Sequence, residues 1–223
     1  MRVITIGGGK VGAFIASELV AGGHEVVIVE KDAARIAEAA ATGVAAGAAW
    51  VAADGCEVDA LGAISPETAD VVVAATGDDE DNLVVALLSK QEFAVPRVIA
   101  RVNNPDNEWM FNETWGVDVA VSTPHLLTSL VQEAVSVGDL VRLLSFDGGR
   151  VRLSAINLSD TSAAIGVAIS ELGLPRDSSI VAVVRDQGVV VPRGDTALAV
   201  GDEVLVLVSN ESEPRLRELL SAV

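Results

Sequence analysis

The first 122 residues alternate between two hydrophobic patterns. Short runs of Val, Ile and Ala that are apolar at every position are typical of strands buried on both faces of a parallel sheet. Longer segments between them carry apolar residues at helical spacing. The patterns predict strands at Arg2–Ile6, Glu25–Val29, Ala48–Ala52, Asp70–Ala75, Arg97–Val102 and Asp118–Val121, and helices at Lys10–Ala21, Asp32–Ala41, Val58–Ile64, Asp81–Phe93 and Asp106–Trp115. This alternation predicts an α/β fold, a Rossmann-type doubly wound parallel sheet with right-handed crossovers.

The alternation of strand and helix patterns ends after Pro124. An apolar helix is predicted over Leu126–Val137, and the short strands and turns that follow it indicate a small α+β C-terminal domain. Hairpin turns are expected at Asp147-Gly148-Gly149 and Asp186-Gln187-Gly188. The other expected elements are strands at Leu140–Phe146, Val151–Asn157, Ile180–Arg185, Val189–Pro192 and Glu203–Val208, and helices at Ala163–Leu172 and Glu213–Leu220. We therefore expect an N-terminal domain of residues 1–122, a connecting helix of residues 123–138 and a C-terminal domain of residues 139–223.

Charge and composition narrow the class of partner. The chain has 15 basic and 32 acidic residues, a formal net charge of −17, which repels nucleic acid and anionic lipid. We therefore expect no nucleic acid polymer as partner. No apolar run approaches the roughly 20 residues that cross a bilayer, so we also expect no direct membrane insertion. The single cysteine, Cys56, excludes an internal disulfide and fits a cytoplasmic protein. We expect no signal peptide, since Met1 to Ile6 has the pattern of a strand.

A glycine motif lies where the first predicted strand meets the first helix. Residues 7–12, Gly7-Gly8-Gly9-Lys10-Val11-Gly12, match G-x-G-x-x-G, the fingerprint of dinucleotide-binding folds. In this motif Gly7 permits a tight turn, Gly9 lets the backbone approach phosphates, and Gly12 lets helix and strand pack closely. The helix N-terminus adds free N–H groups and a positive dipole end. The motif predicts binding of an adenine nucleotide through its phosphates, with Lys10 either a counter-charge or a solvated side chain.

An acidic residue follows the second strand at the spacing this motif requires. Glu30 lies eighteen residues beyond Gly12 and is expected to accept hydrogen bonds from the ribose hydroxyls. Its charge should reject a 2′-phosphate, which favours NAD(H), ATP, ADP or AMP over NADP. The next residue, Lys31, is either solvated or near the adenine edge.

Other strand ends should meet at the same crevice, because ligands of such sheets bind at the carboxyl ends of the strands. We expect Asp54 and Gly55 near the adenine, and the backbone of Thr76 and Gly77 near the ribose and phosphates. Arg101 either balances phosphate charge or pairs with an acid. The acidic run 78–81 precedes a helix, and we interpret it as N-capping rather than a cation site, so no metal site is predicted.

Catalytic residues are scarce. A dehydrogenase needs a proton donor or acceptor beside the hydride site, yet the chain has no tyrosine and only two histidines, His24 and His125. His24 lies in a turn, and His125 begins the connecting helix without an obvious acid partner. We therefore predict no catalytic residues and a sensor rather than an enzyme. The alternatives are a small NAD-dependent oxidoreductase and a scaffold with a vestigial site.

Several segments together resemble one known family. In the first half they are residues 6–12, 29–32, 75–83, 99–103 and 116–122, and in the tail residues 173–175, 180–185, 191–196 and 201–204. Their order and spacing are similar to those of the RCK family (regulator of K⁺ conductance), also called KTN or TrkA type, whose members regulate Trk/Ktr potassium uptake.

The resemblance implies a cytosolic ring of RCK dimers docked under a membrane potassium channel or transporter subunit, at the inner face of the cell membrane. NAD(H) or ATP/ADP would shift the shape of that ring and so gate transport. By match, the nucleotide contacts are Gly7, Gly8, Gly9, Lys10, Val11, Glu30, Asp54, Thr76, Gly77 and Arg101. Lys10 stands where relatives often carry an arginine that faces the terminal phosphates; it keeps the charge without the fork. His125 follows Pro124 where some relatives carry a cation-bridging glutamate.

The connecting helix is apolar beyond one narrow stripe, so we expect it to pack across a dimer partner through Leu126, Leu127, Leu130, Val131 and Val135. Trp109, Phe111 and Trp115 either support that contact or belong to the core.

Overall fold

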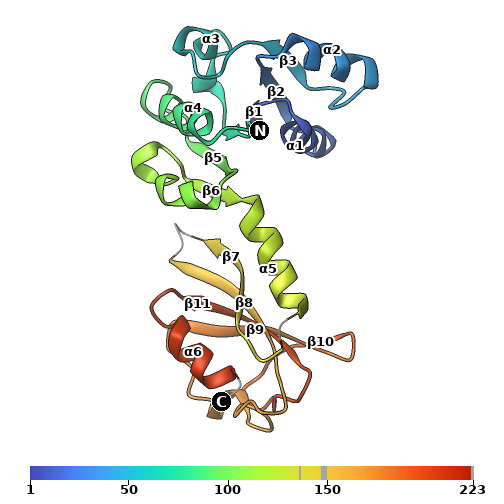
Figure 1. Ribbon diagram of the computed structural model, residues 1–223, viewed down its shortest axis with the longest axis vertical. Helices are drawn as coiled ribbons and strands as arrows, with labels where there is room; N and C mark the ends of the chain where they lie inside the picture. Colours follow the sequence, from blue (N-terminus) through green and yellow to red (C-terminus); the bar gives the residue numbers. More distant parts are fainter. Residues whose placement is uncertain (136, 147–149, 222–223) are drawn as a thin grey trace. The chain divides into compact units, whose positions relative to one another are not determined.

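The computed structural model describes residues 1–135, 137–146 and 150–221, and its chain divides into two compact units, Met1–Pro124 and His125–Val223 (Figure 1). Each unit has its own sheet and its own hydrophobic core. No helix among the described residues is long and apolar enough to cross a membrane.

The first unit contains a six-stranded parallel sheet in the order β3-β2-β1-β4-β5-β6. The strands are β1 (Arg2–Ile6), β2 (Glu25–Glu30), β3 (Ala49–Ala52), β4 (Val71–Ala74), β5 (Arg97–Val102) and β6 (Val119–Ser122). The helices are α1 (Lys10–Ala21), α2 (Ala33–Thr42), α3 (Val58–Gly62), the 3₁₀ helix η1 (Pro66–Thr68) and α4 (Asp79–Gln91). The chain reverses its direction across the sheet between β1 and β4, which is where doubly wound folds bind ligands. The predicted doubly wound parallel sheet is confirmed.

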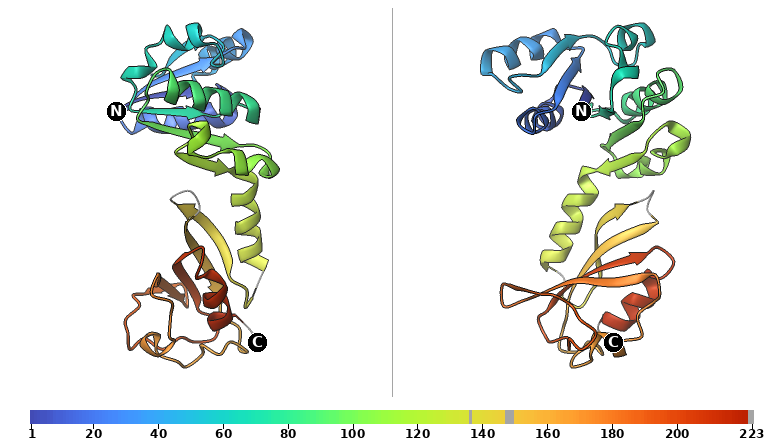
Figure 2. Two further views of the ribbon diagram at one scale, coloured as in Figure 1. Left: turned by 90° about the vertical axis from the view of Figure 1, so that its left-hand side faces the viewer. Right: turned by 180° about the vertical axis from the view of Figure 1, so that it is seen from behind.

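Both faces of this sheet are covered, which explains why its strands are apolar at every position (Figure 2). Successive side chains of a strand point to opposite faces. Ile4 and Ile6 pack in the cluster that holds Leu61 of α3 and Val85 of α4. Ile28 lies in the opposite cluster, with Ala16 of α1.

The predicted helix over Asp106–Trp115 is wrong. The segment forms two 3₁₀ helices, η2 (Pro105–Met110) and η3 (Glu113–Trp115). Phe111 adopts a non-helical ψ of 77° and is buried in the sheet core, while the Asn112 side chain caps the second turn by accepting from the Thr114 N–H. Burial of Phe111 and the Asn112 cap therefore interrupt the helix. This placement also makes Phe111 a core residue and not a surface contact.

The acidic run before α4 behaves as expected, although the helix begins two residues earlier than predicted, at Asp79. The Asp78 side chain caps it by accepting a hydrogen bond from the Asp81 N–H at 3.0 Å. The N-capping interpretation is thus confirmed for Asp78.

The second unit contains a five-stranded antiparallel sheet in the order β10-β9-β11-β8-β7, with α6 packed against β11. Its elements are α5, which begins at Thr123 in the first unit and ends at Val135, β7 (Val141–Phe146), β8 (Val151–Asn157), the 3₁₀ helix η5 (Ile169–Glu171), β9 (Ser178–Arg185), β10 (Gly188–Val190), β11 (Glu203–Ser209) and α6 (Glu213–Leu220). The predicted small α+β domain is confirmed. The hairpin turn expected at Asp147-Gly148-Gly149 lies outside the described residues. Asp186 and Gln187 form the turn between β9 and β10 with φ of 49° and 64°.

A second predicted helix, Ala163–Leu172, is also wrong, since only Ile169–Glu171 is helical, as a 3₁₀ turn. Gly166 has a φ of 76°, and isolated bridges join Ile165 to Leu198 and Ala168 to Ala197. The backbone therefore pairs with residues 197–198 rather than with itself.

The connecting helix is observed as α5, beginning three residues before the predicted Leu126, and the predicted end at Val137 falls beyond the described part of that helix.

A buried ion pair secures the turn before β11. Asp202 is fully buried and accepts hydrogen bonds from Arg185 Nε and Nη2 at 2.7 Å each and from the Ala199 N–H at 2.8 Å. Burial by itself would raise the pKa of the Asp202 carboxyl, but the hydrogen bonds from Arg185 and Ala199 outweigh it and hold the pKa below its ordinary value.

Asp202→Asn should lower the thermal stability of the chain at neutral pH. It should also reduce the loss of thermal stability that occurs as the pH falls. A carboxyl with a depressed folded-state pKa contributes stability above its unfolded pKa, near 3.8, and loses it as the pH falls through the folded value. Thermal unfolding between pH 2 and 7 measures this. Asp195→Asn, at an exposed position, is the matched control and should leave the profile unchanged. Equal profiles for Asp202→Asn and the native chain would contradict the prediction.

Candidate functional site

A cavity of about 1040 Å³ opens in the first unit at the carboxyl ends of the strands. Large concave sites at this edge of a doubly wound sheet are the usual ligand sites of the fold. The structure brings together all the predicted site residues except Gly12, and they line the cavity as Gly7, Gly8, Gly9, Lys10, Val11, Glu30, Lys31, Asp54, Gly55, Thr76, Gly77 and Arg101.

The glycine bend has the backbone that the motif predicts. Gly7 has a φ of 99°, in the region that favours glycine, and its N–H donates to the Val29 carbonyl at 2.8 Å. Gly12 lies behind the bend, where a Cβ would be 1.9 Å from the Gly7 carbonyl oxygen. A Cβ on Gly9 would meet nothing within 4 Å, and no side chain caps the N-terminus of α1. The bend therefore leaves the first-turn N–H groups of α1 open to an anion.

Glu30 is engaged mainly by the protein itself. It is 4 % exposed, and Oε2 accepts from the Gly8 N–H at 2.9 Å and from Arg35 Nη1 at 3.0 Å. Oε1 accepts from the Asp32 N–H at 2.9 Å. A carboxylate oxygen accepts about two hydrogen bonds, so one acceptor position remains, on Oε1. The predicted ribose contact thus has room for one hydroxyl rather than two.

Arg35 was missed by the sequence analysis, although it lines the cavity from α2. Its position in the first turn of α2, three residues after the Asp32 cap, is the signal that would have indicated it. The hydrogen bond to Glu30 and that carboxylate's charge raise the pKa of the Arg35 guanidinium, which keeps it a cation beside the buried acid.

Trp50 of β3 was also missed. A Cβ on Gly8 would lie 2.4 Å from Trp50 Cζ3 and 3.1 Å from Glu30 Cβ, so the indole packs directly against the glycine bend. The ring is partly exposed and lines the cavity, as does Phe14 of α1. The cavity therefore extends past the bend along an aromatic wall.

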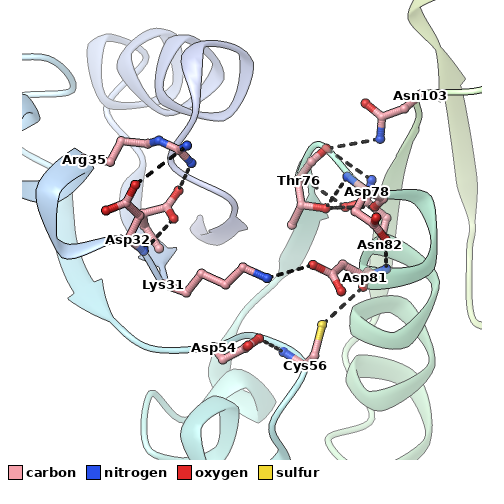
Figure 3. A network of polar contacts seen from close by, with 11 residues as sticks. Lys31, Asp32, Arg35, Asp54, Cys56, Thr76, Asp78, Asp81, Asn82 and Asn103 are labelled. Atoms are coloured by element: carbon pink, nitrogen blue, oxygen red, sulfur yellow. Dashed lines mark hydrogen bonds and ion pairs between the residues drawn. The ribbon is translucent and has the colours of Figure 1, made fainter.

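An ion pair links the residue that follows β2 to α4 at this edge of the sheet (Figure 3). Lys31 Nζ lies 3.2 Å from Asp81 Oδ2. The hydrogen bond to Asp81 and its charge raise the pKa of Lys31. Lys31 is thus engaged, neither simply solvated nor unpaired.

Cys56 lies below this ion pair in Figure 3, where its N–H donates to Asp54 Oδ1 at 2.9 Å. Burial first, and then the nearby Asp81 and Asp54 carboxylates, raise the pKa of the Cys56 thiol to about 12. The thiol is protonated at neutral pH and offers no nucleophile to the cavity.

Two buried polar side chains fix the loops that follow β4 and β5. Asn82 Oδ1 accepts from the Thr76 N–H at 2.9 Å, and Asn82 Nδ2 donates to the Arg101 carbonyl at 2.8 Å. Asp79 accepts from the N–H groups of Asn103 and Asn104 and from the side-chain amides of Asn103 and Asn107. Burial opposes its ionisation, but these hydrogen bonds lower the Asp79 pKa below its ordinary value. The described residues contain no group of three or more His, Cys, Asp or Glu side chains arranged for a metal ion.

Cations without a carboxylate partner remain in the cavity. Arg101 is half-buried, its Nε is buried without a hydrogen-bond partner, and no described carboxylate forms an ion pair with it. Lys10 is exposed at the mouth and is likewise unpaired among the described residues. In a chain of net charge −17, unpaired cations beside an uncapped helix N-terminus indicate a site for an anion.

Comparison with known proteins gives matches over nearly the whole chain. The TrkA-N domain family model matches residues 3–123, and the TrkA-C domain model matches residues 153–221. The Trk system potassium uptake protein TrkA of Mycobacterium tuberculosis is 48 % identical over 225 residues, which cover 99 % of this chain and 98 % of that protein. A TrkA homolog of Archaeoglobus fulgidus is 34 % identical over 97 % of this chain, which spans 49 % of the length of that relative.

Solved structures share the fold. The GsuK channel bound to NAD matches 100 % of this chain with a TM-score of 0.65 at 17 % identity, and this chain spans 40 % of that one. The GsuK structure bound to ADP matches 62 % of this chain and 35 % of its own, with a TM-score of 0.53 at 16 % identity. At these identities the likeness concerns the fold alone.

Gly12→Ala and Gly9→Ala should differ sharply in stability, although both add one methyl group to the same motif. At Gly12 the methyl meets the backbone of Gly7, so the bend or α1 must shift, and we expect a loss of about 2 kcal/mol or more in the free energy of unfolding. At Gly9 it enters open space, and we expect a change of at most about 1 kcal/mol. Urea unfolding followed by circular dichroism measures both. Equal losses would show that Gly12 is not packed as described.

Proposed function

The chain belongs to the TrkA family of Trk-system potassium uptake proteins, and from this premise we propose that it is the nucleotide-sensing regulatory subunit of a membrane potassium transporter or channel. The observation that carries the proposal is the cavity beside the glycine bend, with its uncapped α1 N-terminus and the unpaired Arg101. A polyphosphate would be the anionic partner that the helix N-terminus and Arg101 do not have among the described residues.

An adenine nucleotide fits the chemistry of the cavity from end to end. In our proposal the phosphates bind at Gly7, Gly8, Gly9, Lys10 and Val11, with Arg101 as a second cation. The free acceptor position of Glu30 takes one ribose hydroxyl. The adenine lies between Lys31 and the Asp54–Gly55 turn, and the backbone of Thr76 and Gly77 completes the site. NAD(H) and ATP or ADP share these parts, and the GsuK structures named above were solved with NAD and with ADP.

We propose binding without turnover. The cavity thiol has a pKa of about 12, the chain has no tyrosine, and neither histidine lines the cavity. These features remove a thiolate, a tyrosine and a histidine as proton donors or acceptors for hydride chemistry, so they weigh against the alternative of a small NAD-dependent oxidoreductase. A nucleotide regulates such a protein by binding one of its conformations more tightly than another.

The surface of α5 supports assembly of several copies. Leu127, Leu130, Val131 and Val135 are 58–74 % exposed and recur at spacings of three and four residues, which places them on one face of the helix. We propose that this face forms a homodimer or a larger ring, which docks on the transporter subunit at the inner face of the membrane. In this proposal residues 1–122 sense the nucleotide, residues 123–138 connect, and residues 139–223 form the regulatory C-terminal domain.

Arg101→Ala should weaken NADH and ADP binding by roughly 10- to 100-fold, because a charge-assisted hydrogen bond contributes about 1.5–3 kcal/mol. Equilibrium dialysis measures the dissociation constants. Arg97→Ala is the matched control, since Arg97 is an exposed arginine at the start of the same strand and does not line the cavity. If the native chain bound neither NADH, ADP nor ATP at millimolar concentration, the proposed function would be wrong.

Leu127→Glu combined with Leu130→Glu should convert the assembly to monomers, because two buried charges without partners cost several kcal/mol. Light scattering coupled to size-exclusion chromatography measures the mass. Gln132→Glu adds one charge to a different face of α5 and should keep the native mass. An unchanged mass in the double variant would exclude this face as the interface.

A further inference from the structure

The ribose end of the cavity carries a cation that the dinucleotide motif does not require. Arg35 reaches from α2 to the cavity and is 49 % exposed, whereas its partner Glu30 is 4 % exposed. The group that a ligand meets first at this end is therefore the guanidinium rather than the carboxylate.

The hydrogen bonds of Glu30 reinforce this asymmetry. Gly8, Asp32 and Arg35 take three of its acceptor positions, and Arg35 neutralises its charge at 3.0 Å. The expectation that Glu30 repels a 2′-phosphate assumes an unpaired carboxylate. The structure shows a paired one, so the repulsion from Glu30 itself is reduced where the ribose would lie.

Arg35 also keeps donors free for a second anion. Of its terminal nitrogens, Nη1 donates to Glu30, while Nη2 forms an ion pair with Asp32 Oδ2 at 4.0 Å that is too long for a hydrogen bond and leaves its N–H groups free to donate. A guanidinium presents five N–H donors in a planar fork that matches a phosphate. Lys31, the other cation at this rim, is held by Asp81 and is less available.

We propose that Arg35 determines specificity at the ribose 2′ position, so that the cavity accepts adenine nucleotides that carry a 2′-phosphate, such as NADPH, as well as those with a free hydroxyl. The proposal rests on the proposed function, because it concerns the same cavity. In Rossmann-type sites a nearby arginine is the group that accommodates a 2′-phosphate.

The test compares 5′-AMP with 2′,5′-ADP, which differ only by the 2′-phosphate, in equilibrium dialysis. The native chain should bind 2′,5′-ADP at least as tightly as AMP. Arg35→Ala should weaken 2′,5′-ADP by roughly tenfold or more and AMP by less than about threefold, as expected for one charge-assisted contact. Arg35→Lys keeps the charge without the planar fork, so its affinity for 2′,5′-ADP should lie between those of the native chain and Arg35→Ala. Lys31→Ala removes a cation from the same rim and should weaken both ligands equally.

Three outcomes would overturn the proposal. The first is a native chain that binds AMP measurably more tightly than it binds 2′,5′-ADP. The second is an equal loss for both ligands in Arg35→Ala, which marks a general charge effect. In both of these cases the proposed function stands. In the third, the native chain binds neither ligand nor NADH, and the proposed function fails with this inference. Thermal unfolding checks that each variant is folded.

Discussion

The hydrogen bonds of the buried Glu30 carboxylate are the interactions on which the first unit depends at the edge of the sheet where the cavity opens. The carboxylate accepts hydrogen bonds from Gly8 in the glycine bend, from the backbone N–H of Asp32 at the N-cap of α2, and from the side chain of Arg35 in α2. The glycine bend and the N-terminus of α2 are thus both held by one side chain at the end of β2 with 4 % exposure. Buried charge is tolerated only when it is paired and hydrogen-bonded, so the local geometry has little freedom. The bend, the α2 N-terminus and the cation beside them are fixed as one unit.

A second set of buried polar side chains fixes the opposite wall. Asn82 joins the loop after β4 to the end of β5, and Asp79 gathers the backbone and amides of residues 103–107. Arg101 is positioned by this network through its backbone, which leaves its side chain without an acidic partner among the described residues. The cation is therefore held in the cavity without neutralisation, which favours an anionic ligand over a neutral one.

The fold of the first unit was accessible from sequence because its signals are local and repeated. Apolar strands, helical spacing and glycine stops place β1 to β6 and α1 to α4 within a few residues. The failures occur where a tertiary contact overrides the local pattern. Burial of Phe111 interrupts one predicted helix, and pairing of Ile165 and Ala168 with a distant segment replaces another. Neither contact produces a periodic pattern in the sequence, so neither could be predicted from it.

The site was accessible in part for the same reason. The glycine motif and the strand ends predict which residues line the cavity, because parallel strands end at one edge. The partners of those residues were not predictable, since they are set by packing. Trp50 against Gly8, Arg35 on Glu30 and Asp81 on Lys31 join residues 5 to 50 positions apart. Arg35 matters most among them, because it offsets the charge that Glu30 alone would present.

The environment of Cys56 has a chemical consequence for this cavity. Peroxide and disulfide exchange act on thiolate, and a thiol with a pKa of about 12 is thiolate in roughly one molecule in 100,000 at neutral pH. A high pKa therefore disfavours oxidation of this cysteine, although it lines the cavity. Under the proposed function, the nucleotide occupancy of this cavity is therefore independent of thiol chemistry at residue 56.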